Sequence, residues 1–156
     1  MTDRANVTIS LRSDIDGEVE ENVFAGEWFR KGETVFIRYE ETGEGGDTVR
    51  TMVRWRDGEL SVTRRGDVES EQKFSAGAIH GGHYRSAHAS FRLETETRLL
   101  IVQFGDLAKA GPSEEQLRPE LPMLLIWHYR LIVNDEPTGE FIIRLQAEEL
   151  LDTQGD

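Results

Sequence analysis

The sequence contains no cysteine among its 156 residues, and this absence excludes several classes of protein at once. Disulfide frameworks, thiol nucleophiles and cysteine-based metal sites all require a thiol group. The chain also lacks any run of 18 apolar residues and any apolar segment close to Met1. It therefore predicts neither a membrane helix nor a secretory leader, and we expect a cytoplasmic protein that has no membrane partner.

Positive charge is also scarce, because 18 lysine and arginine residues face 30 acidic residues and the net charge is −12. Such a charge disfavours nucleic acid as a partner. The negative charge belongs to the two ends: residues 1–47 and 99–156 carry −7 each, whereas residues 48–98 carry +2. The middle segment either disperses both signs over solvated faces or forms a locally positive face that holds a small anion.

Long amphipathic helical patterns are absent, and alternation of apolar and polar residues with a period of two recurs instead, which is typical of half-buried strands. Short turns such as Asp57-Gly58 separate the alternating runs. In the run that ends at Phe104, the alternation predicts that Leu99 and Ile101 share a face with Leu93. The runs cover residues 7–12, 21–30, 34–41, 47–56, 59–65, 68–75, 91–104, 123–133 and 140–148.

These runs predict an all-β protein with eight to ten antiparallel strands in one domain, residues 1–156. Because a closed sheet has no exposed edges, an up-and-down β-barrel is the favoured architecture and a β-sandwich is the alternative. We expect residues 1–5 and 150–156 to be frayed tails. Residues 105–122 predict a long loop with one helical turn, since they contain three of the four prolines.

Several short motifs are spaced over nearly the whole chain: Gly26-x-Trp28, Tyr39-x-Glu41, Val62-Thr63-Arg64-Arg65-Gly66-Asp67, Phe74-x-x-Gly77, Tyr84, Thr95-x-Thr97 and Tyr129-x-Leu131. In order and spacing these motifs resemble the YwiB-like family of uncharacterised bacterial proteins. That resemblance implies a calycin-like (lipocalin-like) β-barrel and no established biochemical role.

Arg64 is the first candidate for a binding site, because it shares the inward parity of Leu60 and Val62. A guanidinium inside a barrel needs a partner, and its planar fork suits a carboxylate or a phosphate. Its partner is therefore either an anionic ligand or an inward acid, such as Glu27 or Glu41.

Further candidates offer polar atoms on strand faces that are predicted to point inward. Aromatic rings with a polar tip suit a pocket wall, and buried hydroxyl groups need hydrogen-bond partners. Each of these residues is equally explained by ordinary packing within a core. The candidates are Tyr39, Tyr84, Tyr129, Thr95, Thr97 and, in a glycine-rich segment, His83.

Three histidines, His80, His83 and His88, lie close together in the sequence, but their spacing matches no compact set of metal ligands. The glycines around the first two indicate a surface loop. We therefore predict no metal site and no cofactor.

Sequence motifs of hydrolases, nucleotide-binding loops and metalloproteases are all missing from the chain. The leading prediction is a barrel that binds a small molecule, with an anionic amphipathic compound as one such ligand. One alternative is a packed barrel that serves as an interaction or scaffold module, or that forms a homodimer through a sheet face. The third hypothesis is a hydrolase or isomerase that uses His83 or His128 as a base, but the sequence favours a protein that is not an enzyme.

Overall fold

The computed structural model describes residues 3–42, 48–105 and 119–150, and these residues form ten β-strands. The described residues contain no helix, so none of them belongs to a helical membrane span. The strands are β1 (Arg4–Ile15), β2 (Glu18–Lys31), β3 (Thr34–Thr42), β4 (Thr48–Arg56), β5 (Glu59–Gly66), β6 (Val68–Phe74), β7 (Ile79–Ser86), β8 (Ser90–Phe104), β9 (Met123–Val133) and β10 (Glu136–Glu149).

Every strand pairs with its neighbours in sequence, and β1 pairs with β10, so the sheet closes into an antiparallel up-and-down barrel. The predicted all-β barrel is confirmed, with the largest number of strands in the predicted range, and the β-sandwich alternative is wrong. The calycin-like character implied by the resemblance stays an expectation.

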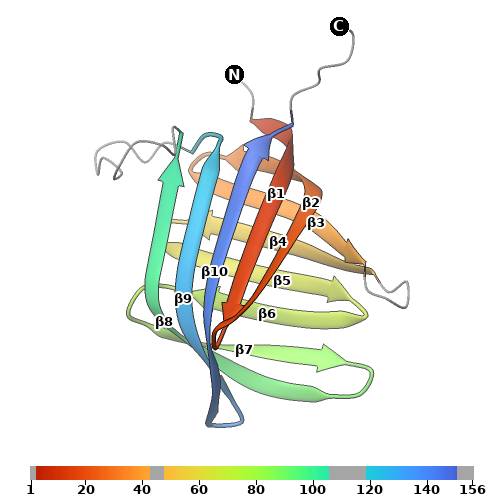
Figure 1. Ribbon diagram of the computed structural model, residues 1–156, viewed down its shortest axis with the longest axis vertical. Coiled ribbons are helices and arrows are strands. Elements are labelled where there is room, and N and C mark those ends of the chain that lie inside the picture. Colours follow the sequence, from red (N-terminus) through yellow and green to blue (C-terminus); the bar gives the residue numbers. More distant parts are fainter. Residues whose placement is uncertain (1–2, 43–47, 106–118, 151–156) are drawn as a thin grey trace, which may run out of the picture.

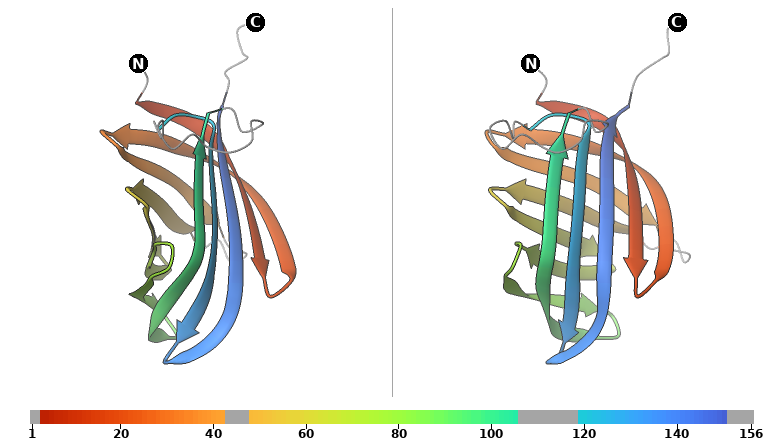
Figure 2. Two further views of the ribbon diagram at one scale, coloured as in Figure 1. Left: turned by 90° about the vertical axis from the view of Figure 1, so that its left-hand side faces the viewer. Right: turned by 60° about the vertical axis from the view of Figure 1, so that its left-hand side comes forward.

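The barrel has two walls whose strands cross each other steeply, as Figure 1 shows. Strands β8, β9, β10, β1 and β2 form one wall, and β3 to β7 form the other, with the interior between them (Figure 2). Strand β2 leaves β3 at Gly26, where the β2–β3 ladder ends. A Cβ atom at Gly26 would lie 2.5 Å from the carbonyl oxygen of Arg38 and 2.6 Å from Cδ1 of Ile9, so only glycine fits at this bend.

Apolar side chains fill the interior, because alternate residues of each strand face inward. Val7, Ile37 and Leu125 are fully buried examples. Three tryptophans also lie in this core: Trp28, Trp55 and Trp127.

A register shift in β8 changes which residues of this strand face inward. Between Thr97 and Leu99 the pairing with β9 slips by one residue, as in a β-bulge. Beyond the bulge, Leu100 packs against the core, whereas Leu99 and Ile101 are 44% and 37% exposed. The predicted inward orientation of Leu99 and Ile101 is therefore wrong, because period-two alternation cannot reveal an extra residue.

The glycine-rich segment around His80 and His83 belongs to strand β7, so the predicted surface loop is wrong. Gly82 lies so close to β6 that an added Cβ would be 2.1 Å from the Glu71 carbonyl oxygen. Here glycine permits a close approach between two strands. From the sequence alone, such a glycine cannot be distinguished from a glycine in a turn.

The predicted turn between β4 and β5 agrees with the structure, whereas the predicted tails agree only in part. Asp57 and Gly58 both have positive φ, which confirms the predicted two-residue turn between β4 and β5. The predicted frayed tail at residues 1–5 is wrong for Arg4 and Ala5, which belong to β1. Leu150 donates a backbone hydrogen bond to Asn6, and residues 151–156 lie outside the described residues.

The predicted long loop is anchored at its two ends, where the backbone N–H of Gly105 donates to the carbonyl of Pro122 at 2.8 Å. The helical turn predicted within this loop falls in residues 106–118, which lie outside the described residues.

Candidate functional site

Five residues from five consecutive strands line up across the inner face of the β3–β7 wall. Tyr39 pairs with Thr51, Thr51 with Arg64, Arg64 with Ser70, and Ser70 with Tyr84. Directly opposed residues of antiparallel strands project to the same face of the sheet. We call these five residues the inner row. The row lies near one rim of the barrel, on the side where the β5–β6 and β7–β8 connections lie (right in Figure 1).

Arg64 lies in the middle of the inner row and forms an ion pair with Glu41, as one of the two sequence interpretations expects. Its Nη2 atom donates to Oε2 of Glu41 at 2.8 Å and to Oε1 at 3.0 Å. Thr51 donates to the same carboxylate at 2.7 Å. The Arg64 and Glu41 side chains are 38% and 24% exposed, so the pair stands at the boundary between the interior and solvent.

One edge of the Arg64 guanidinium stays available. Only Nη2 hydrogen-bonds to a residue that the structure describes, whereas the fork also carries N–H groups on Nε and Nη1. Glu27, the other acid considered for Arg64, lies on the outer face and pairs with Arg38 instead.

Two tyrosines flank this ion pair inside the barrel. Tyr39 is 8% exposed and Tyr129 is 5% exposed. Burial raises the pKa of Tyr39 above its ordinary value, and the nearby Glu41 carboxylate raises it further. Burial also raises the pKa of Tyr129, against smaller opposing effects of a Gln72 hydrogen bond and of Arg64. Both phenols are therefore neutral hydrogen-bonding groups near the ion pair.

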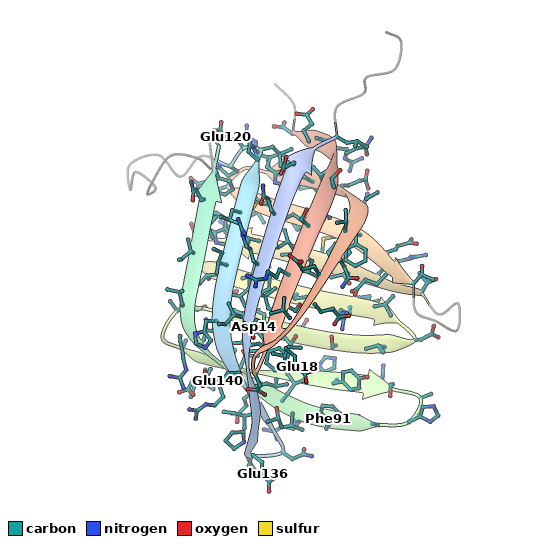
Figure 3. All side chains as sticks on the ribbon, viewed as in Figure 1. Asp14, Glu18, Phe91, Glu120, Glu136 and Glu140 are labelled. Carbon is teal, nitrogen blue, oxygen red and sulfur yellow. The ribbon has the colours of Figure 1, made fainter. Side chains whose placement is uncertain are left out.

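Stacked aromatic pairs surround these polar groups. Phe24 stacks on Tyr39 with ring centroids 4.8 Å apart, and Phe141 stacks on Tyr129 at 5.0 Å. Tyr84 of the inner row stacks on Phe91 at 4.8 Å. Phe91 is labelled on β8 in Figure 3, at the end of the molecule away from Glu120. The Arg64–Glu41 pair is thus bordered by apolar ring faces from both walls.

Four buried polar atoms have no hydrogen-bond partner among the described residues: Nε1 of Trp28, Trp55 and Trp127, and Oγ1 of Thr97. Buried polar groups are normally paired with protein or water, and leaving one unpaired costs about 1–3 kcal/mol. An indole N–H can only donate a hydrogen bond. Each of the three indoles can be satisfied only by a group that accepts a hydrogen bond.

The remaining predicted residues divide between the interior and the surface. Thr95 is fully buried, and its hydroxyl donates to the backbone carbonyl of Lys73, so β6 already satisfies it. Thr97 is buried beside Tyr129 in the β8–β9 ladder. His83 is exposed and pairs with Glu71 and Arg92 on the outer side of β7, so the structure does not bring it to Arg64.

The histidines do not converge on one another. His80 and His83 lie on opposite sides of β7, and His80 hydrogen-bonds to Ser75. Nowhere in residues 3–42, 48–105 and 119–150 do three or more acidic or histidine side chains gather as a metal site requires.

His128 has an acidic partner, but on the outer face of the barrel. Its Nε2 lies 3.0 Å from Oε1 of Glu140, and Arg98 approaches the same oxygen at 3.4 Å. His128 pairs with the exposed residues Leu99 and Ile142, which shows that it faces outward. This histidine and carboxylate therefore lie outside the interior site.

Sequence reasoning did not single out Thr51, Gln72, Phe24 and Phe141, all of which belong to the site. The parity of Val53 and Trp55 could have identified Thr51 as an inward hydroxyl. The other three depend on how the two walls face each other, which no local pattern encodes.

Comparison with known proteins agrees with this architecture. Residues 6–145 match the family described as a domain of unknown function, DUF1934. The chain belongs to this family. The DUF1934 chain is 28% identical over 102 residues to the uncharacterized beta-barrel protein YwiB of Bacillus subtilis (strain 168), covering 63% of this chain and 71% of the relative.

The DUF1934 barrel is also similar to the crystal structure of the YwiB protein from Bacillus subtilis. The TM-score is 0.77 at 23% identity, with 97% of this chain and 96% of that chain covered. The predicted resemblance to the YwiB-like family is therefore confirmed, and the shared property is the β-barrel fold.

Proposed function

We propose that this barrel binds a small amphipathic anion at the rim that carries Arg64. The observation that carries the proposal is the half-engaged Arg64 guanidinium, which faces inward while using a single nitrogen for Glu41. A planar fork with free N–H groups suits a carboxylate, sulfonate or phosphate oxygen pair.

The surroundings of Arg64 suit the apolar part of such a ligand. Ligand sites are usually apolar clefts with a few well-placed polar groups. Ring faces of Tyr39, Tyr84 and Tyr129, each stacked on a phenylalanine, provide apolar surface beside the charge. The unpaired indole and hydroxyl groups deeper in the barrel add donors and so favour acceptor atoms on the guest.

Decanoate and decanol are suitable probes, because they share a chain length and differ in charge. We expect saturable binding of decanoate in isothermal titration calorimetry, at least tenfold tighter than binding of decanol. Because Arg64→Gln would leave Glu41 without its cation, the double variant Arg64→Gln/Glu41→Gln removes both charges together. This variant should weaken decanoate binding about tenfold and leave decanol binding unchanged.

Arg54→Gln is the control for general electrostatic attraction, since Arg54 is exposed on the outer face of β4 and its loss makes the net charge more negative, whereas the double variant leaves the net charge unchanged. Decanoate binding should be within twofold of wild type in this control. Equal affinities for decanoate and decanol, or an equal loss in Arg54→Gln and the double variant, would contradict the proposal.

A further inference from the structure

The outer face of β2 to β5 carries a recess that is separate from the inner row. Its volume is about 840 Å³, which lies within the range of small-molecule sites, about 300–1,000 Å³. Tyr39 and Thr51 lie in its floor, although their side chains face the interior. The other lining residues are Ala25, Gly26, Glu27, Arg38, Glu40, Arg50, Met52, Thr63 and Arg65.

We propose that this recess binds a phosphorylated small molecule, whose phosphoryl group bridges Arg50 and Arg65. The two arginines are directly opposed in the β4–β5 ladder, and both are exposed on its outer face. Like charges at directly opposed positions destabilise a sheet. A bound anion removes this repulsion, so the geometry favours an anionic ligand over an empty recess.

Nearby carboxylates compensate these two cations poorly. Arg50 approaches Glu40 at 3.9 Å, and the two side chains are 81% and 62% exposed, so solvent screens the contact. On the β6 side, Glu69 hydrogen-bonds to Arg85. The hydrogen bond and charge of Arg85 are the main causes that lower the pKa of Glu69, and the charge of Arg65 lowers it to a smaller extent.

Arg38, the third cation of the recess, is already engaged. Its Nη2 atom lies 2.7 Å from Oε1 of Glu27, and its guanidinium lies 5.3 Å from the ring centroid of Phe29. These contacts hold Arg38 at the wall of the recess with its charge matched. The least compensated positive charge of the recess is therefore at Arg50 and Arg65.

A phosphoryl group fits this pair better than a single carboxylate. A phosphate monoester carries about −1.5 to −2 charges at neutral pH and three acceptor oxygens, so it can match two guanidinium forks. Thr63, which precedes Arg65 by two residues on the same face, adds a hydroxyl donor. Met52, opposite Thr63 in the ladder, offers an apolar surface for the rest of the ligand.

The charge around the recess limits the size of the ligand. Glu27 and Glu40 stand at its wall, and the chain as a whole carries −12. An extended polyanion such as RNA would meet repulsion from the acidic surface beyond Arg50 and Arg65, whereas a compact phosphate monoester would not. The structure therefore favours a small organic phosphate.

Phenyl phosphate is the probe for this site, because it joins a phosphoryl group to a small apolar ring. We expect saturable binding to the full chain, followed by ¹H–¹⁵N NMR, with the largest shifts at the amides of Arg50, Thr63 and Arg65. Arg50→Gln and Arg65→Gln should each weaken binding at least tenfold. Arg54→Gln, on the same strand but outside the recess, should change the affinity less than twofold.

Three results would overturn the inference. One is the lack of saturable binding at phenyl phosphate concentrations up to about 10 mM. Another is an equal loss of affinity in Arg54→Gln and Arg65→Gln, which would indicate nonspecific attraction. The third is tighter binding of a single-stranded oligonucleotide that Arg54→Gln also weakens, which would indicate an extended polyanion surface.

The recess and the interior site can be separated by one further variant. Arg64→Gln/Glu41→Gln should leave the phenyl phosphate shifts at the amides of Arg50, Thr63 and Arg65 unchanged, because Arg64 and Glu41 face the interior and any binding there is a separate event. If this double variant abolishes phenyl phosphate binding while Arg65→Gln does not, the phosphoryl group binds inside the barrel and the outer recess is not its site. Failure of decanoate binding, in contrast, would leave the outer site intact.

Discussion

Removing the charge of Glu41 should make the barrel bind anions more tightly, because Glu41 competes with a ligand for Arg64. Glu41→Gln keeps the size of the side chain and an oxygen that can accept from Thr51. It removes the negative charge that now holds Nη2 of Arg64 at 2.8 Å. The whole guanidinium fork then becomes available to a ligand carboxylate.

The size of the effect follows from the repulsion that the substitution removes. Two unit charges about 6 Å apart repel by about 1.4–2.8 kcal/mol when the effective dielectric constant is about 20–40. Because the Arg64 and Glu41 side chains are 38% and 24% exposed, screening favours the lower value. A change of about 1.4 kcal/mol corresponds to about tenfold in affinity.

Isothermal titration calorimetry with decanoate measures this change, and decanol serves as the uncharged reference. Glu40→Gln is the matched control, since it removes the same charge from the neighbouring outward position. We expect Glu41→Gln to tighten decanoate binding about tenfold and Glu40→Gln to change it less than twofold. Unchanged or weaker decanoate binding in Glu41→Gln would refute the idea that Glu41 and the ligand share Arg64.

Three further predictions concern stability and ionisation. Thr97→Val should raise the free energy of unfolding by about 1 kcal/mol, because it removes an unpaired buried hydroxyl. Thr95→Val should lower the free energy of unfolding by about 1–3 kcal/mol, because it leaves the Lys73 carbonyl without its donor. Urea denaturation measures both changes, and equal losses in the two variants would contradict this prediction. Gly26→Ala should lower the free energy of unfolding by about 1–3 kcal/mol, because the new Cβ would lie 2.5 Å from the Arg38 carbonyl oxygen. Gly81→Ala is the control, since a Cβ atom there would have no atom within 4 Å, and it should change the free energy of unfolding little in the same assay. Above pH of about 10, the unfolded chain releases phenol protons that folded Tyr39 and Tyr129 retain because their pKa values are raised, so stability should fall as the pH rises. The test is urea denaturation at pH 9 and pH 11, roughly one unit on either side of the ordinary tyrosine pKa. Between these two pH values the free energy of unfolding should fall less in Tyr39→Phe/Tyr129→Phe than in wild type. An identical fall would show that these phenols do not contribute to the pH dependence of stability.

The strand order could be predicted from the sequence because each strand pairs with its neighbour and the turns are local. Asp57-Gly58 is an example, since two residues with positive φ specify a tight hairpin. The β8 bulge could not be predicted in this way, because Leu99 and Leu100 are both aliphatic and the alternation fits either register. Strand β7 was obscured for a related reason: its glycines serve close packing rather than turns.

The candidate site could be predicted in part. The parity of Leu60 and Val62 placed Arg64 on the inner face, and Glu41 was one of two acids considered as its partner. To choose between Glu27 and Glu41, one must know which side chain faces inward, Glu27 on β2 or Glu41 on β3. His83 shows the limit of such reasoning, since its distance from Arg64 depends on which face of β7 it occupies.

The closing ladder between β1 and β10 also constrains how the protein is made. Val7 pairs with Glu149, so β1, which is synthesised before the other nine strands of the barrel, gains its second neighbour only when β10 has been synthesised. Until then the β1 edge that faces β10 has unpaired backbone groups, a state in which strands pair readily with other chains. The barrel must therefore complete its closure after most of the chain has emerged, and long-range pairing of this kind is a slow step in folding.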